Sequence, residues 1–264
     1  NPAGDAIEYA VYLGGMTDEE GQDIAIDSSG NAYVVGFVHQ PATGFPILNA
    51  FQPTLAGGLG DAIVAKFNPD GTLRYSSFLG GKGAGIDNSY ERAHAVAADD
   101  EGHLYVTGAT SSSVNFPIVG GVQSANKGGF DMFVTKVAPG GNTLVFSTYI
   151  GGTLSDMGFD IALDADHNVY VVGNVRSFDN PSTPQNEGMP VASAFQPVFG
   201  GDVSDAFVLK LAAAGNQLLF ATYLGGSANE SDDGTSVAPT GGIAVDAQRN
   251  VYVTGHTTSA NFPT

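Results

Sequence analysis

The sequence contains no cysteine, and only 9 of its 264 residues are Lys or Arg. The absence of cysteine excludes disulfides, zinc–thiolate sites, iron–sulfur clusters and thioether-linked haem. The few basic residues face 27 Asp and Glu, which gives a formal net charge of −18. Nucleic acids and anionic membranes are bound through clustered Lys and Arg, so this composition argues against both as partners and favours cations.

Long apolar runs are also missing, because none approaches the roughly 20 residues that span a bilayer. No membrane insertion is therefore expected. Hydrophobic residues still make up 42% of the chain and aromatic residues 10%. That content is enough to build a core, so the sequence predicts a folded domain rather than a disordered acidic tail.

A Gly-Gly pair preceded by Leu or Ile recurs along the whole chain. Its first glycines are Gly14, Gly80, Gly151 and Gly225, which gives spacings of 66, 71 and 74 residues. Self-similarity at a fixed period of this kind indicates a repeat architecture.

Each full repeat carries four short segments rich in Val, Ile, Tyr, Phe and Thr and bounded by Gly, Asp, Asn or Pro, which is typical of β-strands. In chain order we name them strands a to d. Strand a ends at a hairpin Asp, strand b carries a Tyr-Val pair, strand c has the pattern Asp-x-x-Val-x-Lys, and strand d ends at the Gly-Gly pair. In the first repeat these landmarks are Asp27, Tyr33, Asp61 to Lys66, and Gly80. The hairpin acids are interpreted as turn-formers, since Asp hydrogen-bonds the backbone of its own turn.

Four antiparallel strands in about 70 residues predict an all-β fold, a β-propeller with four-stranded blades. We expect one propeller, or one segment of a propeller, over residues 1–264. The expected parts are a d strand of a split blade (6–15), three complete blades (16–81, 82–152 and 153–226), and strands a and b of a fourth blade (227–264).

The repeated strings carry a family resemblance. These strings are Ala-Val-Asp-x-x-x-Asn-Val-Tyr-Val-Thr-Gly, Ala-Phe-Gln-Pro, and Gly-Gly followed closely by Asp-Ala-Phe-Val-x-Lys. They resemble the SBBP-type bacterial β-propeller repeat of secreted and cell-surface proteins. The resemblance covers nearly the whole chain and implies the propeller fold and an extracellular or cell-surface location. It implies no shared activity and no catalytic residues.

The expected total is fifteen strands, and the fourth blade lacks its c strand. Three interpretations stay open. In the first, the sequence is an excerpt of a longer propeller. In the second, another subunit or copy supplies the c strand by β-augmentation at an open blade edge. In the third, the ring is an incomplete four-bladed one closed by a modified blade.

Acidic residues recur in the connections from strand d to strand a, which lie on the same face as the long loops between strands b and c. Carboxylate oxygens beside loop carbonyls are the ligands that Ca²⁺ prefers. The sequence therefore offers a calcium site, with a solvated acidic rim as the alternative. The candidate ligands are Glu19, Asp23, Glu91, Asp156, Asp160 and Asp233.

Motifs for catalysis or for other cofactors were sought and not found. The sequence shows no nucleophile elbow, no phosphate-cradling loop and no zinc-binding His pair, so we expect no haem, zinc or nucleotide. The leading hypothesis is a non-enzymatic structural or adhesive module that meets a protein, a cell-surface polymer or copies of itself. The alternative is a carbohydrate-active propeller enzyme that uses rim carboxylates such as Glu19 and Glu91 as a pair.

Overall fold

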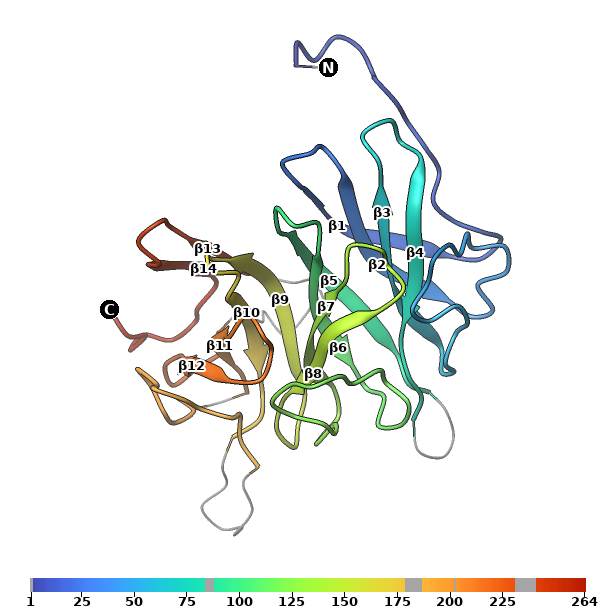
Figure 1. Ribbon diagram of the computed structural model, residues 1–264. Helices are drawn as coiled ribbons and strands as arrows, with labels where there is room; N and C mark the ends of the chain where they lie inside the picture. Colours follow the sequence, from blue (N-terminus) through green and yellow to red (C-terminus); the bar gives the residue numbers. More distant parts are fainter. Residues whose placement is uncertain (1, 84–87, 179–186, 202, 231–240) are drawn as a thin grey trace.

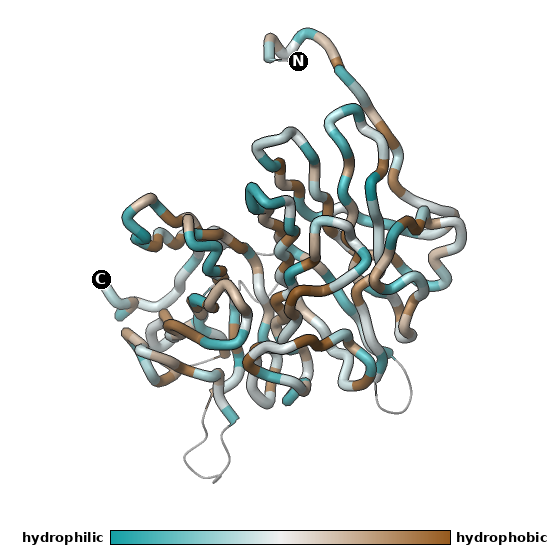
Figure 2. Tube along the Cα trace, viewed as in Figure 1, coloured by the Kyte–Doolittle hydropathy of each residue, from teal (hydrophilic) through white to brown (hydrophobic). Residues whose placement is uncertain are grey.

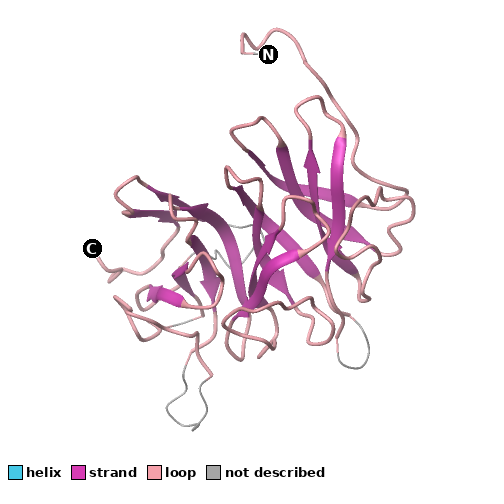
Figure 3. Cartoon of the chain, viewed as in Figure 1, coloured by secondary structure: helices cyan, strands magenta, loops and turns pink. Residues whose placement is uncertain are grey.

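The computed structural model describes residues 2–83, 88–178, 187–201, 203–230 and 241–264. These residues form fourteen β-strands in four antiparallel sheets and contain no helix (Figure 3). The described part of the chain thus has no helix that could cross a membrane.

The first three sheets have four strands each, in sequential order (Figure 1). Each pairs neighbours along the chain, so every connection inside a sheet is a hairpin or a loop between adjacent strands. The strands of the first sheet are β1 (Glu19–Ile26), β2 (Ala32–His39), β3 (Gly60–Phe67) and β4 (Leu73–Leu79). Those of the second are β5 (Glu91–Ala98), β6 (Leu104–Thr110), β7 (Asp131–Val137) and β8 (Leu144–Ile150). Those of the third are β9 (Asp156–Leu163), β10 (Val169–Val175), β11 (Asp205–Leu211) and β12 (Leu218–Leu224).

The fourth sheet has two strands, β13 (Gly241–Val245) and β14 (Val251–Gly255). They correspond to strands a and b of the other sheets. Within the described part of the chain, no strand pairs with the other long edge of β14.

The segment 6–15 differs from the expectation, because no strand forms there and the first strand begins at Glu19. The segment is largely exposed, but Tyr9, Val11 and Leu13 lie beside the first sheet. Hydrophobic residues are spaced along it, and the chain before it leads away from the sheets to the N-terminus (Figure 2). A d-type strand pairs only with a c strand, and the described residues offer no free c strand to it. Its place in a split blade stays a prediction.

The sheets stand side by side in an open series, with strand a of each innermost. Strand β1 contacts β5, β5 contacts β9, and β9 contacts β13. The series does not close into a ring (Figure 1).

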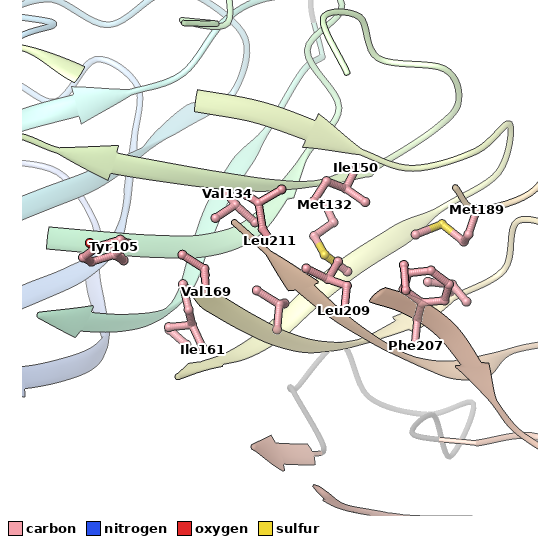
Figure 4. Close-up of a cluster of buried hydrophobic side chains, with 14 of the residues drawn as sticks. Tyr105, Met132, Val134, Ile150, Ile161, Val169, Met189, Phe207, Leu209 and Leu211 are labelled. Carbon is pink, nitrogen blue, oxygen red and sulfur yellow. The ribbon is translucent and has the colours of Figure 1, made fainter. Parts of the chain in front are cut away.

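Hydrophobic clusters fill the spaces between successive sheets. One lies between the first and second sheets and includes Tyr33, Val64 and Phe133. The next lies between the second and third sheets and is shown in Figure 4; its members include Tyr105 and Val134 of the second sheet and Leu209 of the third. A smaller cluster around Tyr170 and Ile243 joins the third sheet to the fourth. Each sheet is thus stabilised by its neighbours, since burial of apolar surface is the main favourable contribution to folding.

A β-bulge in strand a explains the glycine that ends the Tyr-Val-x-Gly motif of strand b. The pairing of β1 with β2, of β5 with β6 and of β9 with β10 shifts by one residue in the middle of strand a. The shift brings a strand-a carbonyl over the glycine opposite. A Cβ at Gly108 would stand 1.9 Å from the Arg92 carbonyl oxygen, and one at Gly36 would stand 1.9 Å from that of Glu20. No side chain fits there.

We predict that Gly108→Ala lowers the free energy of unfolding by about 2–3 kcal/mol, because the backbone must move to admit the methyl group. Gly21→Ala is the matched control: Gly21 also lies in a strand at a bulge, and its added Cβ meets nothing within 4 Å. Urea unfolding followed by circular dichroism measures both. Equal losses in the two variants would contradict this explanation of the motif.

Candidate functional site

The a–b hairpin end of each complete sheet carries a cluster of Asp, Tyr and Lys. In the first sheet, Asp27 Oδ1 accepts hydrogen bonds from the backbone N–H groups of Ser29 and Asn31, both at 2.9 Å. Its other oxygen lies 2.8 Å from the Tyr33 hydroxyl and 3.9 Å from Lys66 Nζ. The hairpin Asp is therefore the turn-former that the sequence predicts, and it also anchors side chains from strands b and c.

The same cluster recurs in the second and third sheets. The hairpin carboxylate lies 2.9 Å from the tyrosine hydroxyl in the second sheet and 3.0 Å in the third. The lysine of strand c lies above the tyrosine ring, 4.6 to 4.7 Å from its centroid in all three sheets. A cation over an aromatic face is attracted by the ring quadrupole. The clusters are Asp27-Tyr33-Lys66, Asp99-Tyr105-Lys136 and Asp164-Tyr170-Lys210.

Partner groups keep the hairpin carboxylates ionised. Burial opposes ionisation of Asp164, but hydrogen bonds from Asn168, Lys210 and Tyr170 outweigh it and hold the pKa of Asp164 below its ordinary value. Burial and the neighbouring carboxylate both raise the pKa of Tyr105, which keeps this phenol protonated as a donor.

The clusters also reach the next sheet. The Gly102 carbonyl oxygen, in the second hairpin, lies 3.1 Å from the Tyr33 hydroxyl and accepts a hydrogen bond from Lys66 Nζ at 3.2 Å. Gly102 has a positive φ of 88°, and His167 holds the equivalent left-handed position in the third hairpin. His167 Nδ1 lies 3.8 Å from Asp99 Oδ2, so the contact crosses to the previous sheet here as well. These polar groups join neighbouring hairpins as well as closing their own.

At the opposite end of the strands, the Asp that begins each c strand is buried against the Gly-Gly pair. Asp131 Oδ2 accepts hydrogen bonds from Gln123 Nε2 at 2.8 Å and from the Lys127 N–H at 3.0 Å. The same Gln accepts one from the Gly151 N–H at 3.1 Å. A Cβ at Gly151 would stand 2.5 Å from Asp131 Cγ, so the carboxyl group occupies the space that a side chain would need. Gln52 and Gln196 make the equivalent contacts in the first and third sheets, with a longer Gln196 Nε2–Asp205 Oδ2 distance of 3.5 Å.

The acid at the start of the following strand a lies beside this group. Asp156 Oδ2 accepts hydrogen bonds from the Gly152 N–H at 2.8 Å and from Ser177 Oγ at 2.7 Å. Glu91 accepts from Thr110 Oγ1 at 2.8 Å, from Ser112 Oγ, and from the Gly81 N–H at 3.4 Å. The N–H of the second glycine of the pair thus donates a hydrogen bond to the strand-a acid of the next sheet.

The junction of the third and fourth sheets shows two carboxyl groups meeting. Asp205 Oδ1 and Glu230 Oε2 are buried and have no hydrogen-bond partner among the residues that the structure describes. Both point at Gly225, where an added Cβ would stand 2.3 Å from Asp205 Oδ1 and 2.7 Å from Glu230 Oε2. Burial, with the charge of Glu230, raises the pKa of Asp205 to about 7. We expect the two carboxyl groups to share one proton, which would satisfy both oxygens. The pKa of Asp131 is likewise raised to about 7 by burial, with the charge of Asp156 adding to the effect.

The acids predicted as calcium ligands occupy three kinds of place. Glu91 and Asp156 are buried at the sheet junctions just described, and Glu19 accepts hydrogen bonds from its own loop, from the Gly15 N–H and Thr17 Oγ1. Asp23 and Asp160 follow the strand-a bulges, and each accepts a hydrogen bond from a backbone N–H of the next sheet, at 2.8 Å from Val96 and 2.7 Å from Ile243. Asp233 lies outside the described residues.

None of the described acids among these six belongs to a group of three metal-binding side chains. Among the described residues, the group that brings three such side chains within 4.8 Å of one another is Asp99, Glu101 and His103. It lies on the second a–b hairpin, at the other end of the strands, and Asp99 already accepts hydrogen bonds from the Glu101 and His103 N–H groups. Calcium binding at the predicted acids stays a prediction.

Sequence reasoning missed the paired role of the strand-c lysines and strand-b tyrosines. A signal was present, because three of the nine basic residues recur at the same place in strand c. For the fourth repeat, the sequence prediction named Asp233, which lies outside the described residues. The structure places Glu230 at the position of Glu91, where it accepts hydrogen bonds from Thr257 Oγ1 at 2.9 Å and from Ser259 Oγ.

Comparison with known families matches residues 219–263 to the SBBP beta-propeller repeat. The matched stretch includes most of β12 and all of β13 and β14, and the resemblance seen in the sequence is confirmed there. No curated protein matches the chain.

The raised pKa values of Asp131 and Asp205 predict that stability falls as the pH rises from about 4 to 7. In that interval the folded chain holds protons that the unfolded chain has lost, so the free energy of unfolding declines by up to about 1.4 kcal/mol per pH unit for each group. Asp205→Asn removes one titrating group and leaves an amide N–H that can donate to Glu230, so part of the slope should disappear. Urea unfolding at several pH values measures the slope, and Asp18→Asn, at an exposed acid, is the control. An unchanged slope in Asp205→Asn would refute the shared proton.

Proposed function

We propose that this chain is a non-enzymatic, extracellular β-propeller module that binds other proteins, copies of itself included, through the open ends of its series of blades. In this proposal each four-stranded sheet is one blade, and β13 with β14 is the inner half of another. The module binds its partners through the same kind of apolar contact that packs one blade against the next.

The observation that carries the proposal is the outer face of the first sheet. Ile24 of β1 is 61% exposed, whereas the residues at the equivalent place in the next strands a are buried: Val96 and Ile161 are each 6% exposed and Ile243 is 8% exposed. Ile26, on the same face, is 68% exposed. This face therefore carries the residue types of a blade-to-blade contact without a blade against it. Exposed apolar patches of this kind mark interaction sites.

The N-terminal segment covers part of the face. Tyr9, Val11 and Leu13 lie near Ile24 and Phe67, and a cavity of about 280 Å³ remains between them. The cover is incomplete, so apolar surface stays open to a partner.

The extracellular location rests on the resemblance of the repeat to those of secreted and cell-surface proteins. The formal net charge of −18 is compatible with it. A high net charge of one sign keeps an extended repeat protein soluble while apolar contacts supply the affinity.

The enzymatic alternative gains nothing from the geometry. Glu91 is fully buried and accepts hydrogen bonds from Thr110 and Ser112, so it does not present a carboxyl group to a sugar beside Glu19. A glycosidase pair needs two carboxyl groups that flank a bound substrate.

Association through the first sheet is tested with Ile24→Asp. We predict that the wild-type chain self-associates with rising concentration in sedimentation velocity and that Ile24→Asp weakens this association about tenfold or more, since a buried Ile contributes about 1.5–3 kcal/mol. Val198→Asp is the matched control, because Val198 is also exposed, at 70%, but lies in a loop of the third sheet. Association that is equally strong in Ile24→Asp, or a chain that stays monomeric at high concentration, would contradict self-association by this face.

A further inference from the structure

Among the described strands, β14 lacks the strand-c neighbour that every other strand b has. Strands β2, β6 and β10 each pair with a strand c on the side away from strand a. Along the corresponding edge of β14 lies a cavity of about 310 Å³, lined by Val253 and His256 on one side and by Ala206 and Leu224 of the third sheet on the other.

The registers of the three complete sheets agree on what such a strand places opposite each residue. Lys66, Lys136 and Lys210 pair with Tyr33, Tyr105 and Tyr170. The strand-c acids Asp61, Asp131 and Asp205 pair with Val38, Thr110 and Val175, five residues further along strand b. Transferred to the fourth sheet, this register sets a lysine opposite Tyr252 and an acid opposite Thr257.

Tyr252 and Asp246 have the arrangement that binds the strand-c lysine in the other sheets. Asp246 accepts hydrogen bonds from the Gln248 and Asn250 N–H groups and from the Tyr252 hydroxyl at 3.2 Å, as the other hairpin acids do. Yet no ion pair with Asp246 occurs among the described residues, and Tyr252 is 58% exposed, whereas Tyr33 and Tyr105 are fully buried beneath their lysines. The fourth cluster is a carboxylate and a ring without their cation.

We infer that the edge of β14 binds one extended β-strand of the repeat's own strand-c type, Asp-x-x-Val-x-Lys, antiparallel to β14 and with its lysine on Asp246 and Tyr252. Main-chain hydrogen bonds along the edge supply affinity, and the acid–lysine spacing fixes the register. Phe133 and Phe207, the residues two after the acid, pack toward the preceding sheet, whereas Val134 and Val208 pack toward the following one. Of these two positions, only the residue two after the acid therefore enters the space between β14 and the third sheet, because neighbouring side chains of a strand point to opposite faces. The inference rests on the proposed function, in which open blade ends are binding surfaces, and it names the chemistry of the partner at one of them.

The test uses the full chain and a fluorescent peptide with the sequence of residues 128–137, Gly-Gly-Phe-Asp-Met-Phe-Val-Thr-Lys-Val. Binding is followed by fluorescence anisotropy and by hydrogen exchange of residues 251–257. We expect saturable binding, slower exchange in those residues, and about tenfold weaker binding when the peptide lysine is replaced by Ala. That loss corresponds to about 1.4 kcal/mol, within the range of a desolvated cation–π contact.

Asp246→Asn in the protein separates specific binding from adhesion of an apolar peptide. The amide oxygen of Asn keeps the hairpin acceptor but removes the charge, so this variant should bind the lysine peptide about tenfold more weakly and should no longer distinguish it from the Ala peptide. Asp70→Asn, at an exposed acid on the c–d hairpin of the first sheet, is the control and should bind as wild type.

Equal affinity of the lysine and Ala peptides for the wild-type chain, or protection outside residues 251–257, would overturn the inference. Its failure differs from failure of the proposed function. Self-association through Ile24 without peptide binding would support the proposed function and refute the inference about the β14 edge. A monomeric chain that binds the peptide in register would support the inference and refute self-association.

Discussion

Burial of one sheet against the next is the constraint on which the structure depends. A four-stranded sheet of this repeat has two apolar faces and cannot cover either by itself, so every complete sheet is stabilised by its neighbours. The clusters around Tyr33, Tyr105 and Tyr170 each draw residues from two successive sheets. The strand-a bulge and the glycine beneath it belong to the same constraint, since they bend the innermost strand where neighbouring sheets come closest.

Polar groups at the two ends of the strands fix how the sheets meet. At the hairpin end, Lys66 reaches the Gly102 carbonyl of the next sheet, and at the other end the Gly152 N–H reaches Asp156. Apolar contact alone is non-directional and would allow neighbouring sheets to slide. Two sets of directional hydrogen bonds, one at each end, hold the angle and the register between them.

Much of the fold could be predicted from the sequence, because strand patterns and hairpin residues are local. The first three sheets lie within the expected ranges 16–81, 82–152 and 153–226, and the hairpin acids form the expected turns. The segment 6–15 has the d-strand pattern but forms no strand, since a strand needs a partner that the pattern does not supply. The candidate site was harder still. Asp23 and Asp160 look alike as calcium ligands in the sequence, but the backbone donors that they bind belong to the next sheet and follow only from the packing.

The two-stranded fourth sheet makes local stability unequal along the series of sheets. Stability in a series of units with nearest-neighbour contacts is approximately a sum of unit and interface contributions. The β13–β14 unit has one interface and half the strands, whereas the second sheet has two interfaces. Within the described strands, the β13–β14 unit thus has the smallest sum of contributions, and we expect it to open locally before the second sheet does.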